Sequence, residues 1–197
     1  DYFPIFNILR NNNKILASGV LANLFLMAKG YDLGYENKWV RDNNYLRFIP
    51  RLRGILKKHD EQIILPVDFA FGSNKRNERL LMQSPFRENI WDVGHETTKL
   101  FISNLRKAKS IFMKGPLGFS EIPIFSYSTV GILKEISKLS KNKKIFSLLG
   151  GGHLTSTIKK YKIKSNFSYI STSGGALIHY LAGEKLPGIE ALKSGIN

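Results

Sequence analysis

Short runs of glycine, serine and threonine recur in this sequence where an apolar stretch has just ended. The clearest are Gly150-Gly-Gly152 and Ser171-Thr-Ser-Gly-Gly175, and the same arrangement stands at Gly19 and at Gly115-Pro-Leu-Gly118. Glycine lets a backbone approach an anion closely, and the free amides of a first helical turn donate to phosphate oxygens. One such turn is explained by conformation alone, but two in consecutive units favour anion binding.

Each of these turns stands between an apolar run and an amphipathic stretch, which predicts strands that lead into helices. The expected strands cover residues 14–18, 62–67, 110–113, 144–149 and 167–170. The expected helices cover residues 5–12, 20–28, 50–59, 97–108, 127–139, 155–161 and a stretch that ends at residue 181. This alternation predicts an α/β fold with a three-layer, Rossmann-like parallel sheet and helices on both faces.

In a parallel α/β sheet, the turns from strand to helix all emerge at one edge, beside the helix N-termini, and ligands bind there. The turns at Gly151 and Ser173 are roughly twenty residues apart, the length of a tight strand–helix–strand unit, so both can face one polyphosphate. His153 directly follows the glycine turn, where it either contacts phosphate or caps the turn, and the residues alone leave both roles open.

Several other functions lack the residues they need. There is no GxxxxGK[ST] phosphate loop, no GxGxxG fingerprint and no GxSxG elbow. Cysteine is absent, which excludes disulfides and thiolate chemistry. The histidines, His59, His95, His153 and His179, show no metal-ligand spacing, so we predict no metal held by protein side chains.

The chain is strongly basic, with a formal net charge of +15. Such a surface attracts polyanions and can bind nucleic acid through counterion release. The basic residues are spread along the chain without a nucleic-acid-binding motif, so we favour solvated helix faces and predict no specific nucleic-acid partner. The longest apolar stretch, residues 15–28, is interrupted by Asn23 and is shorter than the roughly 20 residues of a membrane helix, so we predict no membrane span.

The turns and their flanking residues together resemble the phosphoglycerate kinase family. The resemblance rests on seven short motifs, which follow the family's order and spacing from about Ile15 onwards. They are, with the family's pattern in parentheses, Ser18-Gly-Val-Leu-Ala-Asn23 (GGGMAN), Leu65-Pro-Val-Asp68 (LPVD), Asp92-Val-Gly94 (DIG), Gly115-Pro-Leu-Gly-Phe-Ser-Glu121 (GPMGVFE), Gly150-Gly-Gly-His153 (GGGD or GGGH), Tyr169-Ile-Ser-Thr-Ser-Gly-Gly-Ala176 (ISTGGGA) and Glu184-Lys-Leu-Pro-Gly-Ile-Glu-Ala-Leu192 (GKELPGVAAL). The histidine form of the glycine turn resembles archaeal members.

This resemblance implies that residues 1–197 are the nucleotide-binding, C-terminal domain of a two-domain kinase of glycolysis and gluconeogenesis. Such an enzyme transfers a phosphoryl group reversibly between ATP and 3-phosphoglycerate with Mg2+. We expect the start of the domain and the N-terminal substrate domain to be absent, so that the chain alone is inactive. The implied partners are ATP/ADP and, through the missing domain, 3-phosphoglycerate, in a cytoplasmic monomer. The alternative is a stand-alone nucleotide- or polyanion-binding module without catalysis.

The resemblance also implies roles for individual residues. The nucleotide-binding candidates are Gly19 at the adenine, Pro116 and Phe119 on the nucleoside, Glu121 on the ribose hydroxyls, and Gly150, Gly151, Gly152, His153 and Leu154 at the phosphates. The catalytic candidates, near the transferring phosphoryl group, are Thr172, Ser173, Gly174 and Gly175. Many relatives have an aspartate in place of His153 that helps to hold Mg2+. Because Mg2+ prefers oxygen ligands, we expect the nucleotide's own phosphates to hold it here.

Overall fold

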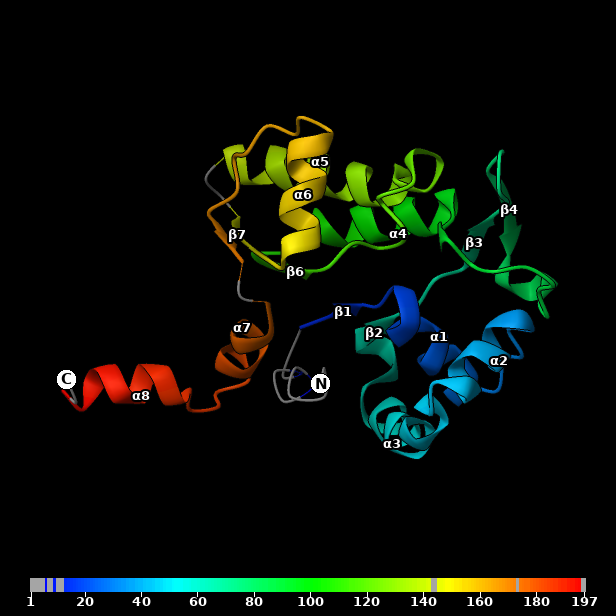
Figure 1. Cartoon of the computed structure of the whole chain (residues 1–197), viewed down its shortest axis with the longest axis horizontal. Coiled ribbons are helices and arrows are strands. Elements are labelled where there is room, and N and C mark those ends of the chain that lie inside the picture. Colours follow the sequence, from blue (N-terminus) through cyan, green and yellow to red (C-terminus); the bar gives the residue numbers. More distant parts are fainter. Residues whose placement is uncertain (1–5, 7–8, 10–12, 143–144, 173, 196–197) are drawn as a thin grey trace.

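A computed structural model describes residues 6, 9, 13–142, 145–172 and 174–195 (Figure 1). The helix expected over residues 5–12 lies largely outside this part of the chain. The helices are α1 Gly19–Ala28, α2 Tyr35–Asp42, α3 Ile49–His59, α4 His95–Leu105, α5 Tyr127–Lys141, α6 Gly152–Lys160, α7 Gly174–Leu181 and α8 Pro187–Lys193. The strands are β1 Ile15–Leu16, β2 Ile63–Ile64, β3 Asp68–Phe71, β4 Asn77–Leu80, β5 Asp92–Val93, β6 Ser110–Lys114, β7 Phe146–Gly150 and β8 Tyr169–Ser171. Short 3-10 turns are η2 Tyr45–Phe48, η3 Asp60–Gln62, η4 Leu81–Gln83 and η5 Pro123–Phe125.

The strands that precede the glycine turns pair in parallel. β6, β7 and β8 form one sheet in that order, and its register places Lys114 opposite Gly150 and Gly150 opposite Ser171. A second parallel pair joins β1 to β2. The predicted class, an α/β fold in which helices flank parallel strands, is confirmed, with the described strands divided among separate sheets rather than joined in one.

Helices α4, α5 and α6 lie together beside β6 and β7 (Figure 1) and share one hydrophobic core with them. Helix α5 contributes Ile132, Leu133 and Ile136, which recur at helical spacing and are buried. Leu16 and Ile64 of the β1–β2 pair also pack against this core. The two parallel sheets are therefore continuous through their side chains.

An antiparallel sheet of order β4–β3–β5 was not predicted. Every residue of β3 is buried, although the strand begins with Asp68. Its partner β4 reads Asn-Glu-Arg-Leu and is mostly exposed, so it lacks the alternation of apolar and polar residues that marks a half-buried strand. Helix α2 was also not predicted, because it is mostly polar and only Glu36 and Val40 of its residues are buried.

Helices α7 and α8 extend away from the body of the molecule towards the C-terminal end (Figure 1). None of the residues of α8 is buried. In the described part of the chain, no helix combines the length and the apolar character that crossing a membrane requires.

Candidate functional site

Three of the turns singled out in the sequence are joined by hydrogen bonds at the carboxyl edge of the β6–β7–β8 sheet. The amide of Gly115 donates to the carbonyl of Gly150 at 3.3 Å, and the amide of Gly151 donates to the carbonyl of Ser171 at 2.9 Å. Parallel pairing in register places the ends of the strands side by side, and the turns that follow them must share one edge. The expected gathering of these turns is observed.

The fourth turn stands apart from this hydrogen-bonded group. Gly19 is the first residue of α1, is exposed and has a positive φ of 57°. Its strand, β1, pairs with β2, and no described hydrogen bond joins Gly19 to the other turns. Its expected place at the adenine therefore stays a prediction.

Helix α6 begins at the end of the 150–152 turn, and the hydrogen bonds among the described residues leave its first amides without an acceptor. The backbone of Gly151 has a φ of 112°, which residues other than glycine rarely adopt. Helix α6 begins at the next residue. The first amide bonded to Gly151 within this helix is that of Thr155, at 3.4 Å, so the amides of Gly152, His153 and Leu154 precede it. The side chain of Leu154 is buried in the core, which leaves its amide as the only group that can face a ligand.

The last predicted turn leads into α7. Thr172 and Gly175 are exposed, and Gly174 begins the helix, whereas Ser173 lies outside the described residues. The turn continues directly from Ser171, whose carbonyl accepts the amide of Gly151. The catalytic candidates thus follow the phosphate candidates along the same sheet edge, and their catalytic role stays a prediction.

The 115–121 loop carries the nucleoside candidates and packs on strand β5. The amide of Phe119 donates to the carbonyl of Trp91 at 2.8 Å, and their rings meet edge to face at 4.8 Å between centroids. Gly118 approaches the same strand so closely that a Cβ there would lie 2.4 Å from the Trp91 carbonyl oxygen. Phe119 is half-exposed and Pro116 is partly buried, so both remain available for a contact.

Glu121, at the end of this loop, faces helix α6. Its Oε1 lies 2.9 Å from Nδ1 of His153, and its carbonyl accepts a hydrogen bond from Nζ of Lys160 at 2.7 Å. A hydrogen bond from its own backbone amide, followed by the hydrogen bond and charge of His153, lowers the pKa of the Glu121 carboxyl. The carboxylate is therefore ionised and can only accept hydrogen bonds.

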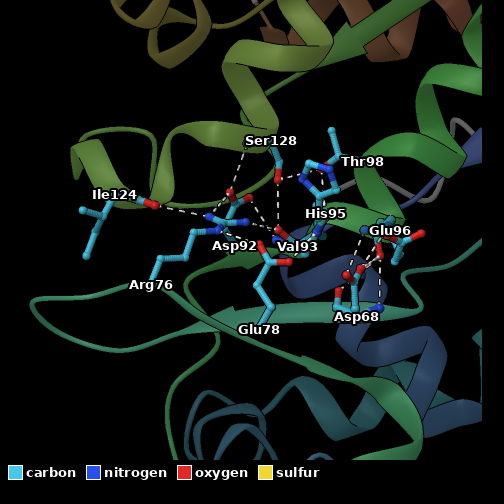
Figure 2. Close-up of polar contacts among 12 residues, drawn as sticks. Asp68, Arg76, Glu78, Asp92, Val93, His95, Glu96, Thr98, Ile124 and Ser128 are labelled. Atoms are coloured by element: carbon cyan, nitrogen blue, oxygen red, sulfur yellow. Dashed lines mark hydrogen bonds and ion pairs between the residues drawn. The ribbon is translucent and has the colours of Figure 1, made fainter.

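A buried ion pair lies next to this loop, and sequence reasoning gave its members no role. Arg76, from the turn before β4, donates Nη1–H to Oδ2 of Asp92 at 2.9 Å and Nη2–H to the carbonyl of Val93 at 2.8 Å (Figure 2). It also donates Nε–H to Glu78 at 2.7 Å and reaches the carbonyl of Ile124 at 3.3 Å. One guanidinium therefore ties the antiparallel sheet to the segment that precedes α5.

The Asp92 oxygen that accepts Arg76 also holds the N-terminal end of α5. The amide of Ser128 donates to Oδ2 of Asp92 at 3.2 Å, and Thr98 of α4 donates to Oγ of Ser128 at 2.9 Å (Figure 2). Burial raises the pKa of Asp92 to about 6, against the lowering effect of Arg76. We call Arg76, Asp92 and Ser128 the buried cluster.

A second buried carboxylate, Asp68 of β3, caps helix α4. It accepts the amides of Glu96 at 2.9 Å and Thr97 at 2.7 Å, which are free donors at the start of that helix (Figure 2). Asp68 and Asp92 both stand in motifs that carry the family resemblance, and that was the signal that could have singled them out.

A groove of about 670 Å³ lies beside the 115–121 loop. Its lining residues are Tyr35, Gly72, Ser73, Asn74, Lys75, Asn77, Arg87, Glu88, Asn89, Trp91, Ile122 and Phe125. None of these belongs to the predicted nucleotide residues, and the groove adjoins the loop through Trp91 and Ile122. It is therefore a neighbour of the predicted site rather than a part of it.

No group of three histidine, aspartate or glutamate side chains in the described residues is arranged to hold a metal ion. Near the start of α6 the described contacts supply one carboxylate, Glu121, and it is already bonded to His153. Mg2+ prefers several oxygen ligands, so this set of side chains does not fit a magnesium site built by protein alone.

The described residues form a mixed α/β fold in which three glycine- or hydroxyl-rich turns share one edge of a parallel sheet. The phosphoglycerate kinase family model matches residues 4–184. The chain is 38% identical to the phosphoglycerate kinase of Methanosarcina mazei over 200 residues and 37% identical to that of Thermoplasma volcanium over 184 residues. These alignments cover 97% and 92% of this chain but 46% and 44% of the relatives.

Solved structures give the same result. The crystal structure of phosphoglycerate kinase from Pyrococcus horikoshii matches 98% of this chain with a TM-score of 0.86 and 34% identity, and 48% of that protein is covered. The enzyme from Coxiella burnetii matches 96% of the chain with a TM-score of 0.80 and 27% identity. This chain belongs to the phosphoglycerate kinase family, whose members named here are phosphotransferases, and it spans about half the length of the relatives it matches.

Proposed function

We propose that residues 1–197 are the nucleotide-binding half of a phosphoglycerate kinase. In the whole protein this half supplies the ATP/ADP site for reversible phosphoryl transfer between ATP and 3-phosphoglycerate. The observation that carries the proposal is the gathering of Gly115, Gly150, Gly151 and Ser171 by hydrogen bonds at one sheet edge. Helix N-termini and exposed glycines at such an edge suit a bound polyphosphate.

The arrangement of the turns supports separate roles for the predicted residues, each at a different part of the nucleotide. The amides at the start of α6 hold the phosphates, and the ionised carboxylate of Glu121 accepts the ribose hydroxyls. Phe119 and Pro116 contact the nucleoside, and Gly19 lies at the adenine. Thr172, Ser173, Gly174 and Gly175 position the transferring phosphoryl group, in a reaction where positioning and electrostatic stabilisation carry most of the catalysis.

Magnesium enters this proposal as part of the nucleotide complex. The described side chains do not fit a protein-held magnesium site, because carboxylates are not clustered at the start of α6. The turns therefore bind Mg-ADP and Mg-ATP as complexes in this proposal.

Titration of the 15N-labelled chain with Mg-ADP and with Mg-pyrophosphate, followed by NMR, tests the ribose role. Glu121→Ala is expected to weaken Mg-ADP about 10- to 100-fold, because hydrogen bonds to a charged group are lost, and to leave pyrophosphate unchanged. Glu190→Ala is the matched control, since Glu190 is an exposed carboxylate on α8 paired with Lys193. Equal weakening of both ligands by Glu121→Ala would refute the ribose role.

A coupled assay with ATP and 3-phosphoglycerate tests the division into halves. We expect no turnover from the 197 residues alone, because the half that binds phosphoglycerate in this proposal is not among them. Turnover by this chain would contradict the assignment. The proposal also carries the expectation of a cytoplasmic monomer, which sedimentation of the purified chain tests in part.

The net charge of +15 favours a second candidate, a polyanion-binding module without catalysis. The dependence of binding on salt concentration distinguishes the two candidate functions. Binding driven by counterion release falls steeply with salt, whereas Mg-ADP held by shaped turns falls less. Nucleotide binding that collapses at moderate salt, with no preference for ADP over pyrophosphate, would favour the second candidate.

A further inference from the structure

Helix α6 presents a line of side chains to the end of the 115–121 loop. Thr157 Oγ1 lies 2.8 Å from Oγ of Ser120, and both side chains are buried. The hydroxyl of Tyr161 donates to the carbonyl of Ser120 at 3.2 Å. His153 and Thr157 are four residues apart and share one face of the helix, and Tyr161, the C-cap residue, follows at the same spacing.

The same face continues to the helix N-terminus, where it reaches Glu121. His153 lies one turn before Thr157, and its Nδ1 is 2.9 Å from Oε1 of Glu121, while Lys160 holds the carbonyl of the same glutamate. The loop that carries the ribose candidate is thus attached to the helix that begins with the phosphate turn. The proposed ribose contact and the proposed phosphate contacts are therefore held together by hydrogen bonds between the loop and α6.

The geometry fixes what each atom of this pair can do. An ionised carboxylate only accepts hydrogen bonds, so Nδ1 of His153 is the donor. Oε1 of Glu121 accepts the hydrogen bond of the imidazole. A carboxylate offers about four acceptor sites, so sites remain for the hydroxyls of a ligand. Side chains of both residues are largely exposed, 57% for Glu121 and 77% for His153, so a ligand can reach the carboxylate.

We propose that His153 is a positioning residue that holds the Glu121 carboxylate ready for the ribose hydroxyls. This rests on the function proposed above and adds to it a specificity role for the residue after the glycine turn. Without the imidazole, the carboxylate keeps only the hydrogen bond from its own backbone amide, and ribose binding must order it further. With the imidazole in place, that order exists before the ligand arrives, which strengthens binding.

The test compares ligands with and without ribose hydroxyls on the full 197-residue chain. Mg-ADP, Mg-2′,3′-dideoxy-ADP and Mg-pyrophosphate are titrated by NMR against the parent chain, His153→Ala and His153→Asn. His153→Ala is expected to weaken ADP about two- to tenfold and to leave the other two ligands unchanged. His153→Asn restores part of the loss, because an asparagine Nδ2–H can donate from nearly the same place as Nδ1–H.

His179→Ala is the matched control. His179 makes the same kind of contact, with its Nδ1 2.6 Å from Oε2 of Glu184, but near the C-terminal end of α7. It is expected to leave all three affinities unchanged. Thermal unfolding of each variant checks the fold, and both exposed pairs are expected to contribute little to it.

Three results would overturn the inference, and they differ in whether the proposed function also fails. If His153→Ala weakens ADP and dideoxy-ADP equally, His153 does not act through the ribose hydroxyls, and the proposed nucleotide site survives. If His153→Ala strengthens ADP, the imidazole competes with the ribose for Glu121. If the parent chain does not prefer ADP to pyrophosphate and Glu121→Ala has no effect, the proposed function fails together with the inference.

Discussion

Two acidic side chains of this domain are paired in opposite ways. Asp92 is completely buried and meets an Arg76 that is only 16% exposed, whereas Glu121 and His153 form their pair in solvent. The first pair binds three parts of the chain together and is closed to any ligand. The second keeps a carboxylate oxygen accessible. The difference separates the residues that stabilise the fold around the site from those that we propose to contact the nucleotide.

Removing the buried carboxylate is the strongest challenge to this comparison. Asp92→Ala is expected to lower the free energy of unfolding by about 3–5 kcal/mol, because the guanidinium of Arg76 loses its buried partner. Urea denaturation measures the change. Glu88→Ala is the matched control, since Glu88 pairs with Arg79 of the same hairpin in a partly exposed setting, and its cost is expected to stay below about 1 kcal/mol. Equal costs for the two variants would contradict the contrast.

The pH dependence of stability isolates the titration of Asp92. Burial raises the pKa of Asp92 to about 6 in the folded protein, from 3.8. As the pH rises from about 4 to about 6, the unfolded chain loses this proton first, so the folded state loses about 2–3 kcal/mol of relative stability. Above pH 6 the difference is constant.

Asp92→Asn cannot titrate and is the reference for this measurement. The free energy of unfolding of the parent chain minus that of the variant is expected to be largest at low pH and to fall between pH 4 and 6. Urea denaturation across that range measures it. A difference that rises with pH would show instead that Arg76 dominates and that the pKa is lowered.

Gly118 is where the two regions touch, so it tests whether they are coupled. The methyl group of Gly118→Ala would lie 2.4 Å from the Trp91 carbonyl oxygen and 2.6 Å from Cα of Asp92. Both are backbone atoms of the chain around strand β5, which do not give way as a flexible side chain does. The loop must shift, with an expected cost of about 1–3 kcal/mol and a weaker affinity for Mg-ADP. Gly131→Ala on α5 is the control, because its nearest neighbour would be 3.7 Å away and helical alanine is favoured. An unchanged affinity in Gly118→Ala would show that the loop adapts independently.

The smallest expected effect is on the stability of the exposed pair. Glu121→Ala and His153→Ala are each expected to change the free energy of unfolding by less than about 1 kcal/mol, because solvent screens their attraction. Denaturation in urea measures both. A loss as large as that of Asp92→Ala would place Glu121 among the structural residues.

The regular elements of the parallel half were predictable from the sequence. The spacing of apolar residues predicted α4, α5 and β6–β8 to within a few residues, and their alternation predicted that these strands run parallel. The antiparallel sheet was not predictable in this way, because β4 is polar and exposed and β3 opens with an aspartate. Their structure depends on partners far along the chain.

The same limit applies to the candidate site. Glycine turns predicted the sheet edge, since their conformation is a local property. The pairing of Glu121 with His153, or of Arg76 with Asp92, is set by which surfaces the fold brings together, and sequence spacing does not reveal it. The line of side chains at residues 153, 157 and 161 was visible in the sequence, but nothing there showed what it faces.

The attachments of the 115–121 loop have a consequence for how the domain matures. Its anchors are the Trp91 carbonyl, the Thr129 hydroxyl and the side chains of α6, all distant in sequence. During synthesis the loop can take up its contacts at Ser120 and Glu121 only after α6 has been made and docked. Binding competence of the proposed site would therefore be among the last properties that the folding polypeptide acquires.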